Sequence, residues 1–160
     1  MLSLQINDIR SFMSHLLTME SFDRFYFVEA SIKMGISYHI DGHLNKDFYD
    51  TETRHSLTRN FSYWKEVRPR IFYLIKGKQP PLGCRIILAL RESDLTRIRV
   101  SSGASFRDED IEGMYLNILY DPESLKLTTG ISYRVFSLDK SLDYAFEQDI
   151  RSFLTDLGIG

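Results

Sequence analysis

Three side chains that could bind a metal ion stand at alternating positions of one short segment. His39, Asp41 and His43 are each two residues apart, so on a continuous strand they would point to the same side. Imidazole and carboxylate groups together bind zinc, nickel or iron, which gives the hypothesis of a small metal-dependent enzyme. The dipeptide Asp41-Gly42 also favours a tight turn. A turn would send the two histidines to different strands, as solvated residues on a wet sheet face.

A second candidate site combines basic and aromatic side chains. Its residues lie along a predicted helix and just beyond it: Trp64, Arg68, Arg70, Lys76 and Lys78. Cations and rings in this arrangement could hold phosphates and stack bases, as in polyanion-binding proteins. The chain as a whole carries 22 acidic against 20 basic residues, a formal charge of −2, and that balance does not favour nucleic acid as a partner. The alternative is a solvated helix face whose tryptophan packs into the core.

The third candidate is the polar side of one strand pattern. From Leu125 to Phe136, apolar residues alternate with a polar set that includes Lys126, Thr128, Ser132 and Arg134. Such alternation predicts a strand with one buried and one wet face. The open face of an antiparallel sheet could carry a ligand or partner surface, but it could equally face water or be covered by the polar segment 45–60.

Several signatures of common enzymes are absent from the sequence. It contains no G-x-x-x-x-G-K-[ST], G-x-G-x-x-G, G-x-S-x-G or H-E-x-x-H motif, so the usual nucleotide-binding, hydrolase and metalloprotease patterns are missing. Cys84 is the only cysteine, and its apolar neighbours favour a small buried hydrophobe over a nucleophile. The acidic residues at 108–112 lack the spacing of a calcium loop, which favours a solvated turn. We expect no cofactor and favour a non-enzymatic protein.

Length and composition are those of one globular domain covering residues 1–160. The chain is 43% hydrophobic and 26% charged, which is ordinary for a folded domain. Its longest apolar runs, such as Ile86 to Leu90, are far shorter than the roughly 20 residues that cross a bilayer. The first residues show no basic start followed by an apolar stretch. We therefore expect a cytoplasmic protein without a membrane partner.

The hydrophobic periodicity predicts an α+β fold of order αββαβαββα. The expected helices cover residues 7–17, 62–76, 93–101 and 140–157, and the expected strands cover residues 25–32, 36–40, 82–91, 114–120 and 125–136. In the first strand, alternation places Ala30 and Ile32 on the side opposite Phe25 and Phe27. The segment 45–60 is expected to be a long connection with at most a turn of helix. Two hairpins indicate a mainly antiparallel sheet of about five strands, with helices packed on one face.

Several stretches resemble a known family over roughly residues 4–153. They are Tyr63-Trp64-Lys65-Glu66-Val67-Arg68-Pro69, Leu74-Ile75-Lys76-Gly77-Lys78-Gln79-Pro80-Pro81, Ile40-Asp41-Gly42-His43 and Ser137-Leu138-Asp139-Lys140-Ser141-Leu142. The chain is similar there to uncharacterised proteins of comparable length from Gram-positive bacteria, classed as a domain of unknown function. The resemblance implies one domain, and it implies no activity or site residues.

Three functional hypotheses follow from these observations. The favoured one is a non-enzymatic binding or protein-interaction domain of a bacterial cytoplasmic protein, whose partner is another protein or a second copy of the chain. The second is the metal-dependent enzyme built on His39, Asp41 and His43. The third is polyanion or nucleic-acid binding through the basic helix, which the charge balance disfavours without excluding it.

Overall fold

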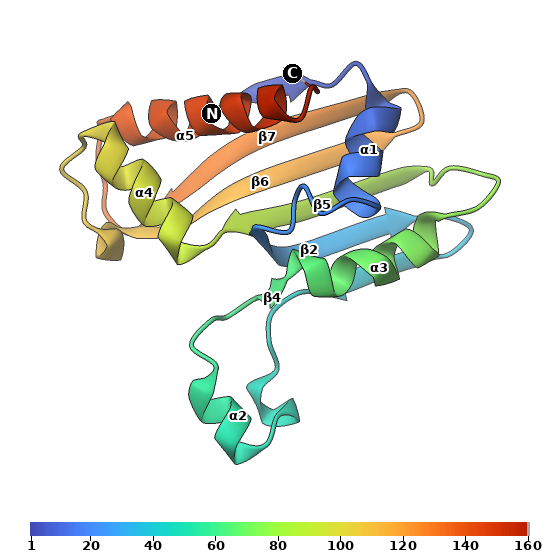
Figure 1. The fold of residues 1–160 in the computed structure, drawn as a ribbon, viewed down its shortest axis with the longest axis horizontal. Coiled ribbons are helices and arrows are strands. Elements are labelled where there is room, and N and C mark those ends of the chain that lie inside the picture. Colours follow the sequence, from blue (N-terminus) through green and yellow to red (C-terminus); the bar gives the residue numbers. More distant parts are fainter. Residues whose placement is uncertain (160) are drawn as a thin grey trace.

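In a computed structural model, residues 1–159 are described and form an α+β fold with seven strands and five α-helices (Figure 1). The elements are β1 (Ser3–Gln5), α1 (Ile9–Leu17), β2 (Phe25–Lys33), β3 (Ser37–Asp41), α2 (Thr51–Ser56), β4 (Ser62–Tyr63), α3 (Trp64–Ile75), β5 (Gly83–Leu90), α4 (Glu92–Ser102), β6 (Ile111–Asp121), β7 (Ser124–Tyr133) and α5 (Ser141–Asp156), with short 3₁₀ turns η1 (Lys46–Phe48) and η2 (Asp108–Asp110). The predicted fold class is confirmed.

The strands form one antiparallel sheet in the order β1-β7-β6-β5-β2-β3, and β4 pairs with the other part of β2. The five expected strands correspond to β2, β3, β5, β6 and β7. The predicted number of strands and the predicted order of elements need correction. Two further strands are present, β1 before α1 and β4 before α3, and helix α2 lies in the segment that was expected to be a connection. With three and two residues, β1 and β4 are too short to show alternation.

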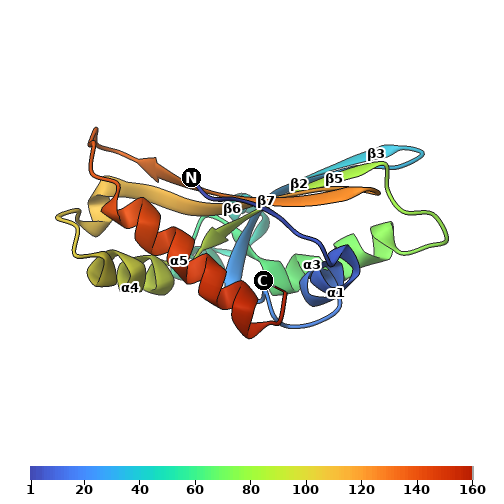
Figure 2. The ribbon, with the colours of Figure 1, turned by 90° about the horizontal axis from the view of Figure 1, so that it is seen from above.

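The helices α1, α3, α4 and α5 lie on the same side of the sheet (Figure 2). The core fills the space between them and the strands, where Phe27, Ile86 and Leu127 are fully buried. Helix α5 shows how the sequence builds this layer, since its buried residues Leu142, Phe146, Ile150 and Leu154 recur every four positions. Within the described residues no helix lies on the opposite side of the sheet, which we call the open face.

The alternation of β2 changes phase at Val28. The pairing of β2 with β5 shifts between Phe27 and Glu29, which is a β-bulge. An extra residue returns the chain to the same face one position later. Phe27 and Ala30 therefore both point into the core, contrary to the prediction that placed Phe25 and Phe27 on the side opposite Ala30 and Ile32.

Residues 44–61 leave the sheet as an extension that we call the arm. In Figure 1 the arm, with η1 and α2, projects beyond the edge at which β3 and β4 lie. Its base is closed by a bridge between His43 and Phe61 and by a hydrogen bond from Leu44 N to Asn60 O at 2.9 Å. Neither η1 nor α2 contains a buried residue. The arm therefore adds nothing to the core.

The exit into the arm requires a glycine. Gly42 N donates to Val28 O at 2.8 Å, which brings the two backbones close together beside the bulge. A Cβ on Gly42 would lie 2.2 Å from the carbonyl oxygen of Phe27. A larger residue at this position would push β3 away from β2.

Four charged side chains join the helix layer to the start of β2. Arg97 pairs with Asp149 at 2.9 Å and with Asp94 at 3.2 Å, while Arg24 approaches the same carboxylates at 3.2 and 3.6 Å. Hydrogen bonding to Asp149 is the main cause that raises the pKa of Arg97. These alternating charges connect α4 and α5 to Arg24, the residue that precedes β2, in one network.

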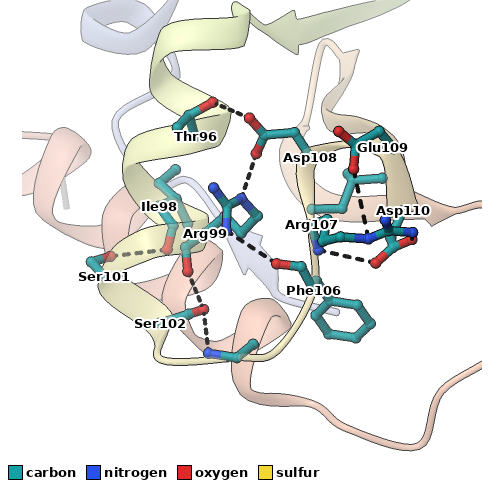
Figure 3. A network of polar contacts seen from close by, with 12 residues as sticks. Thr96, Ile98, Arg99, Ser101, Ser102, Phe106, Arg107, Asp108, Glu109 and Asp110 are labelled. Atoms are coloured by element: carbon teal, nitrogen blue, oxygen red, sulfur yellow. Dashed lines mark hydrogen bonds and ion pairs between the residues drawn. The ribbon is translucent and has the colours of Figure 1, made fainter.

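The acidic segment 108–110 is tied to α4 (Figure 3). Thr96 Oγ1 donates to Asp108 at 2.9 Å, and the Arg99 guanidinium pairs with the other oxygen of that carboxylate. The hydrogen bond from Arg99 comes first, and the one from Thr96 second, among the causes that lower the pKa of Asp108. Arg107 N donates to Asp110 at 3.0 Å. These carboxylates thus accept donors of their own chain.

Candidate functional site

The strand register arranges the side chains of the open face in rows. Directly paired residues share a face, so the pairings give one row that runs His39, Ser31, Arg85, Leu119, Lys126 and Gln5 from β3 to β1. We call it the basic row. The neighbouring row, which we call the acidic row, runs Asp41, Glu29, Ile87, Asn117, Thr128 and Ser3.

A third row of the open face consists of rings and small residues. It runs Tyr63, Tyr26, Ala89, Tyr115 and Gly130. Gly130 has no Cβ to fill the space opposite Tyr115. A Cβ on Gly113 would lie 2.6 Å from Tyr115 Oη, so the phenol extends over that glycine. Burial, followed by the negative charge of Glu112, raises the pKa of Tyr115, which keeps its hydroxyl a hydrogen-bond donor.

A shallow hollow of about 490 Å³ lies over the middle of this face. Its lining includes Val28, Ile87, Tyr115, Asn117 and Thr128 from the strands, and His43 and Phe61 from the base of the arm. Asn117 Oδ1 is buried and has no hydrogen-bond partner within residues 1–159. The hollow therefore combines apolar surface with polar side chains such as Thr128.

Of the three predicted metal ligands, the structure brings two together. His43 Nδ1 lies 2.7 Å from Asp41 Oδ1, and the same oxygen accepts the backbone N–H of His43 at 2.9 Å. The backbone bond comes first, and the side-chain bond second, among the causes that lower the pKa of Asp41. His39 contacts Ser31 Oγ at 3.2 Å instead. Across residues 1–159 there is no group of three or more His, Cys, Asp or Glu residues arranged to hold a metal ion.

The five residues of the predicted polyanion site do not form one surface. Trp64 is fully buried and its Nε1 donates to Leu16 O at 3.0 Å. Arg68 makes two hydrogen bonds of 3.0 Å to the carboxylate of Asp23, so its charge is compensated. Arg70, Lys76 and Lys78 remain exposed. Trp64 is therefore not available to stack on bases, and Arg68, one of the four cations, is already paired within the protein.

The predicted ligand surface on β7 divides into two parts. Lys126 and Thr128 lie on the open face, in the two charged rows. Ser132 Oγ donates to Glu112 at 2.9 Å, and Arg134 Nη1 donates to Glu109 O at 3.3 Å. Those two side chains therefore connect β7 to the start of β6.

Other residues of the face were not predicted from the sequence. Ile87, Tyr115 and Asn117 come from β5 and β6, whose buried sides dominate the pattern. Their outward positions follow from the same alternation that identified Lys126 and Thr128. What the sequence lacks is the register that sets these residues beside one another.

An aromatic and cationic stack closes the end of the third row. Tyr26 and Tyr63 stack with ring centroids 5.7 Å apart, and the guanidinium carbons of Arg59 and Arg91 lie 3.8 and 4.3 Å from the Tyr63 ring centroid. Tyr26 Oη donates to Glu92 at 2.5 Å. Burial, then this bond, raises the pKa of Tyr26. The stack fixes the base of the arm, which contributes Arg59, to the sheet.

The fold and the face define a one-sided α+β protein with an exposed antiparallel sheet. Residues 15–160 match the sequence profile of DUF5721, a family of unknown function, and the chain belongs to that family. The expected membership in a family without an assigned function is confirmed at this level. Comparisons with curated proteins and with solved structures give no match. Within the described residues, no helix combines the length and the apolar character needed to cross a bilayer.

Proposed function

We propose that this protein is a single-domain, non-enzymatic interaction module that binds a protein partner through the open face. The observation that carries the proposal is the apolar surface on that face. Val28, Ile87 and Tyr115 are half-buried and line the hollow. Leu119, which is 41% exposed, stands in the neighbouring basic row, diagonally from Ile87. A sheet face that meets only water usually presents polar residues at its outward positions.

The surroundings of this apolar surface are those of a protein interface. Charged side chains stand at both ends of the rows: Asp41, Glu29 and His39 on one side, and Lys126 on the other. A desolvated apolar centre with a charged and polar rim is the usual anatomy of such contacts.

The proposed setting is the cytoplasm of a bacterium. The resemblance of the sequence implies a bacterial source, and the cysteine content supports the cytoplasm. The single thiol, Cys84, is free and buried, and burial raises its pKa to about 12. Such a thiol is inert, and a chain with one cysteine depends on no internal disulfide and hence on no oxidising compartment.

The proposal is tested by photo-crosslinking in cells of the native host. A benzophenone amino acid replaces Lys126, which is exposed on the open face, and in a matched variant it replaces Tyr144, which is 67% exposed on α5. We expect discrete adducts with a protein from position 126 and none of the same mass from position 144. Equal adducts from both positions, or none from position 126, would contradict the proposal.

A further inference from the structure

We infer that the partner on the open face is a second copy of this chain, packed face to face across a two-fold axis. The inference rests on the proposed function and names its partner. It predicts a symmetric homodimer in which two antiparallel sheets stack as in a β-sandwich, with all helices on the outside.

The order of charges in the two rows avoids like-charge contacts in a symmetric pair. Consider a two-fold axis that runs across the strands between the basic row and the acidic row. Rotation about it keeps each strand over its own equivalent and exchanges the rows. Asp41 then faces His39 of the second copy, Glu29 faces Ser31, and Thr128 faces Lys126. Arg85 faces Ile87, with Glu29 of the second copy one strand away from it. No lysine or arginine of either row faces another one, and no carboxylate faces a carboxylate.

The same axis places apolar side chains near the centre of the contact. Asn117 faces Leu119 of the second copy. Ile87 lies diagonally from that Leu119, one strand spacing of about 5 Å to the side, which joins the apolar surfaces of the two faces.

The charges of the rows are accessible for this contact. Glu29 and Arg85 already pair within one chain at 3.3 Å, but their side chains remain 46% and 48% exposed. Asp41 is 77% exposed while it holds His43. Each group therefore keeps a free side toward a facing sheet.

The face is large enough for a stable dimer. With six strands in the main order and the usual strand spacing and rise, it measures about 25 Å by 27 Å. That is about 700 Å² per copy, close to the roughly 800 Å² per partner of a standard protein–protein interface. In Figure 1 the arm projects past the edge of the sheet, and of its residues only Phe61, at its base, lines the hollow of the face.

The test is analytical ultracentrifugation of the purified full chain from about 1 μM to about 500 μM, a range that covers micromolar dissociation constants. We expect a reversible monomer–dimer equilibrium. Leu119→Arg places a third cation between Arg85 and Lys126 in the centre of the contact and should raise the dissociation constant at least about tenfold. The matched control is Leu138→Arg, at an 82% exposed leucine in the loop before α5, which should leave it unchanged.

A charge exchange tests the axis and does not depend on Leu119→Arg folding. His39→Asp faces Asp41 of the second copy, and Asp41→Arg faces His39, so each should weaken the dimer severalfold. In the double variant His39→Asp/Asp41→Arg each new side chain faces an opposite charge, so dimerisation should be restored. The bond between residues 41 and 43 within one chain is still missing in this variant, so its loss cannot explain the weaker dimer.

Each result decides between the two proposals. A chain that stays monomeric at every concentration, or a dimer indifferent to Leu119→Arg and to the charge exchange, overturns the second copy as partner. If position 126 still crosslinks a different protein in cells, the proposed interaction function stands. If position 126 crosslinks nothing, both fail.

Discussion

The two faces of the sheet are made by the same strands and differ in what their side chains do. On β6, Leu116 points to the helices and is 1% exposed, while Leu119, three residues later, points to the open face and is 41% exposed. On β7, Thr129 is buried and Thr128 is not. The covered face carries most of the core. The exposed residues of the open face, such as Leu119, lie outside that core and are available for a contact.

The largest expected effect separates the two leucines of β6. Leu116→Ala leaves a cavity in the core and should lower the free energy of unfolding by about 2–5 kcal/mol. Leu119→Ala removes an exposed side chain and should change it by less than about 0.5 kcal/mol. Urea unfolding of both variants at low protein concentration measures the difference. Equal losses would show that the open face is part of the folding core.

The next effect concerns the joint between the sheet and the arm. Gly42→Ala places a Cβ against the Phe27 carbonyl oxygen, and we expect a loss of about 1–3 kcal/mol, the usual cost of overpacking. Gly35→Ala is the control, because a Cβ there meets no atom within 4 Å. Thermal unfolding of the two variants measures the contrast. A Gly42→Ala protein as stable as wild type would contradict the close approach of β2 and the chain after β3.

A smaller effect distinguishes the adjacent threonines of β7. Thr129 Oγ1 accepts the backbone N–H of Leu2 at 3.0 Å, so Thr129→Val leaves a buried donor without a partner and should cost about 1–3 kcal/mol. Thr128→Val makes the same change on the open face and should stay within about 0.5 kcal/mol. Chemical denaturation compares the pair. The reverse order would mean that the faces are assigned the wrong way round.

The smallest effect is the acid dependence that Asp41 gives to the base of the arm. Its folded-state pKa is lowered, so its contribution to stability is present above the ordinary carboxyl value of about 3.9 and is lost as the pH falls through the lower folded-state value. Asp41→Asn removes that contribution and should flatten the decline of the melting temperature below about pH 4. Glu123→Gln, at an exposed carboxylate in the turn between β6 and β7, serves as the control. If the melting temperature of Asp41→Asn falls with pH as it does in the wild type, Asp41 does not stabilise the base of the arm in this way.

The long periodic elements were predictable from the sequence because their own residues specify them. The stripe of α5 and the alternation of β7 need no partner to be recognised, and with them came Lys126 and Thr128 on the open face. Two features depended on neighbouring strands. The bulge at Val28 shifts the phase of β2, and the short strands β1 and β4 exist only as pairings.

The candidate sites show the same limit. Trp64 and Arg68 have the composition of a polyanion site, but they bond to Leu16 and Asp23, which lie more than forty residues away in the chain. Tyr115 and Asn117 have no motif around them, and the register with β5 and β7 sets them in the hollow. A single sequence specifies which residues face outward far better than it specifies which of them meet.

Hydroxyl-radical footprinting of the purified chain tests most directly whether the open face packs against a second copy. The protein is labelled at about 1 μM and at about 300 μM, a range that covers micromolar dissociation constants. We predict that oxidation of Leu119 falls at the higher concentration while that of the exposed Leu138 stays the same. Equal oxidation of Leu119 at both concentrations would contradict the face-to-face dimer.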